Sequence, residues 1–95
     1  MIVLNNPETK VPIAIMDGTL ISTIRTGAVT GVCAKYMAPP RSKTVGLFGA
    51  GSQCKTQLMA LKASLPQLEK AYVYDLSRER TEKFAAEMSQ KMNMD

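Results

Sequence analysis

The 95-residue sequence has no histidine, no tryptophan and only two cysteines. Without histidine, this stretch cannot build a His-based metal site or a catalytic Ser/His pair. Cys33 and Cys54 are too few for a disulfide framework, and Met1–Asn5 lacks the basic and apolar segments of a secretory signal, so we expect a cytoplasmic protein. No apolar run approaches the ~20 residues that span a bilayer, which predicts no membrane partner.

Aromatic residues are also scarce, at 5% of the chain. The net charge is +4, and the basic residues are scattered from Lys10 to Lys91 instead of forming one cluster. Nucleic-acid binders need a concentrated basic face and stacking rings, so we expect no nucleic-acid partner. The mild positive charge suits small anionic ligands instead. A hydrophobic content of 45% is that of a folded chain, and this length allows one small domain with a thin core.

The first 40 residues predict a hairpin followed by a helix. Ile2–Leu4 and Val11–Met16 are apolar runs joined by a polar turn. Residues 19–38 carry apolar side chains at helical spacing, which predicts a helix buried on more than one side: Ile21, Ile24, Ala28, Val29, Val32, Cys33, Tyr36 and Met37. Gly27 and Gly31 lie one turn apart, which predicts close packing against another helix. Pro39-Pro40 ends the helix.

The remaining residues follow a strand–helix–strand–helix pattern. Strands are predicted at Thr44–Phe48 and Ala71–Tyr74, and helices at Ser52–Ala63 and from about Arg78 to Met92. A strand, a helix and a second strand within about 30 residues predict a parallel pair with a right-handed crossover. The fold class is therefore α/β, a Rossmann-type βαβα segment preceded by a hairpin and a helix.

One motif in this segment carries chemistry. Gly49 and Gly51 directly follow the first strand and open a helix, and Asp75 ends the next strand, about 20 residues after Cys54. Gly49 allows a sharp turn, and Gly51 lets backbone amides approach a pyrophosphate at a helix N-terminus. Asp75 would accept hydrogen bonds from the adenosine ribose. Cys54 stands where the motif has Gly or Ala, and its small side chain predicts a packed, inert thiol, with a thiol activated by the helix N-terminus as the alternative.

The same residues predict which dinucleotide binds. A carboxylate at Asp75 repels a 2′-phosphate and favours NAD over NADP. Ser77 and Arg78 follow closely, however, and could instead accept that phosphate. The predicted cofactor is NAD, with NADP as the alternative.

Three blocks of the sequence, in this order and spacing, resemble the ornithine cyclodeaminase/mu-crystallin family: Ala14–Thr19, Arg25–Val29 and Gly49–Gln53. The Arg-Thr pair of the second block is the most specific part, because dinucleotide-binding folds in general lack it. The resemblance implies an NAD-dependent enzyme, usually a homodimer, that moves hydride between nicotinamide and the Cα–N bond of an amino or imino acid. It places residues 1–40 in a substrate and dimerisation domain and residues 41–95 in the first half of a nucleotide-binding domain.

The resemblance also implies residue roles. Arg25 matches the arginine that holds the substrate carboxylate; without the resemblance, it would be an ion-paired or solvated side chain. Thr26, Ser52, Gln53 and Asp75 match cofactor contacts. The family's lysine and catalytic aspartate have no match, so we expect an internal piece or truncated product with no catalytic residue and no metal, inactive alone. The alternatives are a ketimine-reductase-like protein, a non-catalytic partner subunit and an inert product.

Overall fold

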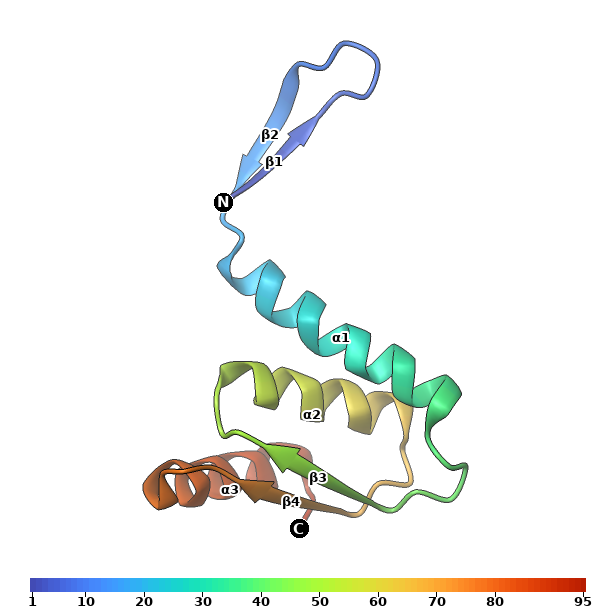
Figure 1. Ribbon diagram of the computed structural model, residues 1–95, viewed down its shortest axis with the longest axis vertical. Coiled ribbons are helices and arrows are strands. Elements are labelled where there is room, and N and C mark those ends of the chain that lie inside the picture. The colour runs from blue at the N-terminus through green and yellow to red at the C-terminus, as the bar shows by residue number, and fades with distance from the viewer.

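The computed structural model describes residues 1–95 and contains every predicted element in the predicted order (Figure 1). The elements are β1 (Ile2–Asn5), β2 (Pro12–Met16), α1 (Thr19–Met37), β3 (Thr44–Phe48), α2 (Ser52–Ser64), β4 (Lys70–Tyr74) and α3 (Arg78–Met92). The hairpin of β1 and β2 projects from the start of α1, away from the other elements. No helix combines the length and apolarity that a membrane span requires.

The predicted parallel pair forms between β3 and β4, from Thr44 opposite Lys70 to Phe48 opposite Tyr74. Side chains alternate across a strand, so one face of the pair carries Leu47 and Val73 and the other carries Phe48 and Tyr74. The first face packs on α2 and α3 and forms the core, whose buried members are Leu47, Cys54, Leu58, Leu61, Leu68, Phe84, Met88 and Met94. This arrangement confirms the predicted α/β fold class.

The last residue extends the pattern of the sheet. The N–H of Asp95 donates to the carbonyl of Glu69 at 3.3 Å, and the carbonyl of Asp95 accepts from the N–H of Ala71 at 2.7 Å. These two bonds form a parallel bridge to Lys70 on the edge of β4 that faces away from β3. After α3, the backbone therefore returns beside β4 in the position of a third parallel strand.

Helix α1 packs on α2 through its small residues, as predicted. Gly27 and Gly31 are its buried positions. A Cβ atom on Gly27 would lie 2.7 Å from the backbone carbon of Thr56, and one on Gly31 would lie 2.8 Å from the carbonyl oxygen of Ala60. The two glycines therefore let the helix backbones approach more closely than any side chain would allow.

The prediction that α1 is buried on more than one side is wrong within residues 1–95. Ile24 is 53% exposed and Val32 is 58% exposed. The glycine stripe faces α2, which turns the apolar stripe away from the only element that α1 contacts extensively. Figure 1 shows that the outer side of α1 has no other element over it. Helical periodicity located the apolar stripe correctly but could not tell what covers it.

Candidate dinucleotide-binding site

The glycine turn between β3 and α2 has the geometry that the motif predicts. Gly49 has a φ of +103°, a backbone conformation that residues other than glycine rarely adopt. Its N–H donates to the carbonyl of Tyr74 at 2.7 Å, which ties the turn to the end of β4. The turn therefore lies at the carboxyl edge of a parallel pair, where open α/β sheets bind their ligands.

The N-terminus of α2 is free to accept an anion. Its N-cap residue is Gly51, so no side chain caps it, and its first turn contains no acidic residue. By contrast, the hydroxyl of Ser77 caps α3 by accepting from the N–H of Arg80 at 3.3 Å. A Cβ atom on Gly51 would meet no atom within 4 Å and would project into open space. Free N–H groups, a favourable dipole and open space together fit a pyrophosphate.

Asp75 connects the glycine turn to the segment between β4 and α3. Its carboxylate accepts hydrogen bonds from the N–H of Ser77 and the N–H of Ala50, both at 2.9 Å. These two bonds hold the pKa of Asp75 below its ordinary value, and the positive charge of Arg80 acts in the same direction, against the opposing effect of desolvation. The ionised carboxylate has lone pairs left on both oxygens, so it can also accept from ribose hydroxyls.

An open depression of about 540 Å³ lies beside this turn. It is lined by Phe48, Gly49, Tyr74, Asp75, Leu76, Ser77 and Arg80. Ser52 and Gln53 lie exposed in the first turn of α2, directly after Gly51. The structure thus brings together the predicted residues of the glycine turn, the start of α2 and the end of β4.

Arg25 and Thr26 lie in the first half of α1, which packs against the first half of α2. The hydroxyl of Thr56, in the first half of α2, donates to the carbonyl of Thr23 at 3.1 Å, one turn before Gly27. This contact places the first half of α1 against the first half of α2. Arg25 is exposed and forms no ion pair, so of its two unaided interpretations the ion pair is wrong. Thr26 is exposed and donates its hydroxyl to the carbonyl of Ser22 at 2.8 Å.

The arginine that faces the depression is Arg80, which sequence reasoning missed. Arg78, the residue suggested as a phosphate ligand, pairs with Glu82 at 2.8 Å, and its side chain is 92% exposed. The i,i+4 spacing of opposite charges at Arg78 and Glu82 is readable from the sequence and predicts such a pair. Arg80 instead lines the depression together with Asp75.

The predicted packed position of Cys54 is confirmed. Cys54 is 8% exposed and belongs to the core. Burial raises the pKa of its thiol, which disfavours the reactive thiolate. Burial and this pKa shift both argue against the alternative of a thiol activated by the start of α2.

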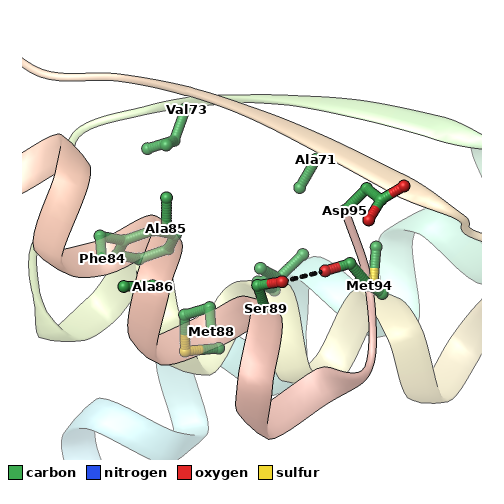
Figure 2. Close-up of a pocket in the computed structure, with 10 residues that line it drawn as sticks. Ala71, Val73, Phe84, Ala85, Ala86, Met88, Ser89, Met94 and Asp95 are labelled. Atoms are coloured by element: carbon green, nitrogen blue, oxygen red, sulfur yellow. Dashed lines mark hydrogen bonds between the residues drawn. The ribbon is translucent and has the colours of Figure 1, made fainter.

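A second cavity, of about 340 Å³, lies between β4 and α3 (Figure 2). Figure 2 shows the side chains of Ala71 and Val73 pointing from β4 toward α3. The hydroxyl of Ser89 is already engaged with the carbonyl of Met94 at 2.7 Å. The walls are mostly apolar and offer little to orient a polar ligand, so the depression at the glycine turn is the candidate for a dinucleotide site.

Comparison with known proteins supports the family resemblance seen in the sequence. The model of the ornithine cyclodeaminase/mu-crystallin family matches residues 1–95. L-lysine cyclodeaminase of Streptomyces rapamycinicus is 40% identical over 81% of this chain and 22% of its own length. The chain spans about a quarter of the length of the curated relatives it matches.

Two solved structures superpose closely. Delta(1)-pyrroline-2-carboxylate reductase of Thermococcus litoralis, in complex with NADH and L-proline, is 46% identical with a TM-score of 0.89. An archaeal alanine dehydrogenase dimer with bound NAD is 34% identical with a TM-score of 0.90. Each superposition covers 98% of this chain and 28% of the other chain.

Proposed function

Because the chain belongs to the ornithine cyclodeaminase/mu-crystallin family, we propose that the protein is an NAD-dependent enzyme acting on the Cα–N bond of an amino or imino acid. The uncapped start of α2 beside the Asp75 carboxylate is the observation that carries this proposal. Nicotinamide supplies hydride transfer when the cofactor is bound. The role of these residues is to bind and orient the cofactor and the substrate.

The glycine turn and β4 hold the cofactor in this proposal. Gly49 shapes the turn, and Gly51 leaves room for a pyrophosphate at the N–H groups of α2. Ser52 and Gln53 contact it from the first turn of α2. Asp75 accepts from the adenosine ribose hydroxyls, and its bond to the N–H of Ala50 keeps its carboxylate beside the turn.

Arg25 binds the substrate carboxylate in this proposal. Its guanidinium is exposed and has no acidic partner within the chain, so its donors remain available. A planar guanidinium can bind both oxygens of a carboxylate at once. Thr26 contacts the cofactor from the next position along α1, and the packing of α1 on α2 supports this shared location.

Two reactions of this class are candidates for the activity of the protein. In the first, an ornithine cyclodeaminase-like enzyme oxidises the Cα–N bond of a diamino acid, loses ammonia on ring closure and reduces the cyclic imine. In the second, a cyclic imine is reduced directly. The 46% identity to a Delta(1)-pyrroline-2-carboxylate reductase favours this second candidate, and the 40% identity to a lysine cyclodeaminase favours the first.

The domain and partner assignments belong to the same proposal. Residues 1–40 contribute to a substrate and dimerisation domain, and residues 41–95 open the nucleotide-binding domain. The exposed apolar side chains of the hairpin and α1, Ile15 and Ile24 among them, support a homodimer interface on this side. No residue of the chain is assigned a catalytic acid or base role, so residues 1–95 alone are expected to be inactive.

The test uses the intact protein with each cofactor and substrate class. NADH binding is measured first, by titration of nicotinamide fluorescence. Ammonia release is then followed with ornithine and lysine in the presence of NAD, because the cyclodeaminase reaction oxidises and then re-reduces its substrate and leaves no net NADH. NADH consumption is followed with a five-membered cyclic imino acid. Turnover with a diamino acid supports the cyclodeaminase reaction, and turnover with the cyclic imine alone supports the reductase. A protein that binds no dinucleotide would contradict the whole proposal.

A further inference from the structure

Arg80 is an unpaired cation on the rim of the proposed cofactor site. It lies in the first turn of α3, five residues after Asp75, and lines the same depression. Its side chain is exposed and forms no ion pair. All five N–H donors of its guanidinium are therefore available to an anionic ligand.

Arg78 provides a contrast within the same helical turn. Its Nε atom donates to Glu82 at 2.8 Å on the outer surface of α3, and it is absent from the lining of the depression. The two arginines have the same charge and a similar position in sequence. Because the two residues lie on different sides of α3, only Arg80 faces the depression at the end of β4.

Asp75 and Arg80 therefore place opposite charges on one rim. A ribose with a free 2′-hydroxyl needs an acceptor, which Asp75 provides. A 2′-phosphate adds a charge of about −1.5 to −2, which Asp75 repels and a guanidinium attracts. The electrostatic influence of Arg80 already reaches the Asp75 carboxylate, whose pKa it helps to lower. Arg80 thus reduces the repulsion that Asp75 alone would exert on a phosphate.

We propose that Arg80 is the specificity-determining residue that admits a 2′-phosphate, so that this site binds NADH in preference but also accepts NADPH. The inference rests on the dinucleotide site proposed above and deepens it. The balance between Asp75 and Arg80, both lining one depression, sets the ratio of the two affinities.

The experiment compares wild-type protein, Arg80→Gln and Arg78→Gln in the intact protein. NADH and NADPH are each titrated by nicotinamide fluorescence at low and high salt. We expect Arg80→Gln to weaken NADPH binding about tenfold and to change NADH binding less than about twofold, because one charge-assisted contact to phosphate is lost at a screened surface. Arg78→Gln should change neither affinity.

Salt provides a second readout. In the wild type, NADPH affinity should fall more steeply with salt than NADH affinity, and Arg80→Gln should remove most of this difference. An unchanged ratio of affinities in Arg80→Gln, or an equal loss for both cofactors, would overturn the role of Arg80 and leave the dinucleotide site standing. A wild-type protein that binds neither cofactor would overturn the proposed function and this inference together.

Discussion

The carboxylate of Asp75 accepts a hydrogen bond at 2.9 Å from the backbone N–H of Ala50, the central residue of the glycine turn. The bond joins the end of β4 to the β3–α2 connection across 25 residues of sequence. The second oxygen of the Asp75 carboxylate accepts from the N–H of Ser77, at the start of α3. One side chain thus fixes three backbone segments around the proposed cofactor site.

Replacing Asp75 with asparagine should destabilise the protein and weaken NADH binding. The two bonds of Asp75 use different carboxylate oxygens, and an amide has only one acceptor oxygen, so asparagine can keep only one of them. Asp17→Asn is the matched control, because a single oxygen of Asp17 accepts both bonds from Thr19 and an amide oxygen can retain them. Thermal melts and NADH titrations of the two variants measure the difference. Equal effects would contradict the two-oxygen role of Asp75.

The same pair predicts a pH dependence. The pKa of Asp75 is lowered in the folded state, so its contribution to stability is fully present above the unfolded value, 3.8, and is lost as pH falls through the folded value. Melts recorded from about pH 7 to about pH 3 should show the difference between wild type and Asp75→Asn shrinking toward zero. A constant difference across this range would contradict the assignment.

Gly51→Val should abolish dinucleotide binding while the fold persists. The φ and ψ of Gly51 are −89° and −179°, an extended conformation that valine also adopts, and no atom lies within 4 Å of its added Cβ. The branched side chain would instead fill the space proposed for the pyrophosphate. Gly46→Val is the matched control, since Gly46 also has open space at its Cβ but lies within β3. Retained NADH affinity in Gly51→Val would remove the basis of the proposed site.

Local pattern was sufficient to predict the strands and helices around the glycine turn. Strand β3 was predicted from Thr44 to Phe48, as observed, because a short apolar run between a polar segment and two glycines has few alternatives. The carboxylate at the end of β4 was predictable for the same reason. The exposure of the apolar side of α1 was not predicted, because periodicity gives a stripe without its partner. The glycine spacing predicted the contact with α2 at Gly27, but Ile24 stays exposed. The role of Arg80 required the direction of α3, which residue spacing alone does not give.

Gly27→Ala should destabilise the α1–α2 contact. Alanine favours an isolated helix by about 1 kcal/mol over glycine. Here, however, its Cβ would lie 2.7 Å from the backbone of Thr56, and backbone cannot move aside as a flexible side chain can. Overpacking of this kind costs about 1–3 kcal/mol, so we expect a net loss of stability in chemical denaturation. Gly46→Ala, with open space at its Cβ, should not lose stability. A stabilised Gly27→Ala variant would show that the helices separate at little cost.

The last prediction concerns Arg25, whose guanidinium is exposed on α1 without an acidic partner. If it binds the substrate carboxylate, Arg25→Lys should raise the KM for the amino or imino acid far more than it changes NADH affinity. Lysine keeps the positive charge but loses the two parallel donors that a carboxylate engages, so we expect a KM increase of about tenfold or more. Because no ion pair within the chain is lost, the melting temperature should stay within about 2 °C of wild type.

Arg41→Lys serves as the control for Arg25→Lys. Arg41 is exposed after the double proline that follows α1 and makes no ion pair. It precedes the start of β3, whereas the glycine turn follows the other end of that strand. The same exchange there should leave both KM and NADH affinity unchanged. Comparable losses for substrate and cofactor in Arg25→Lys would mean that Arg25 reaches the cofactor, and a lowered melting temperature would mean that it supports α1. A selective rise in KM, at unchanged stability, is the result that a carboxylate ligand on this face of α1 requires, because only the geometry of its donors has changed.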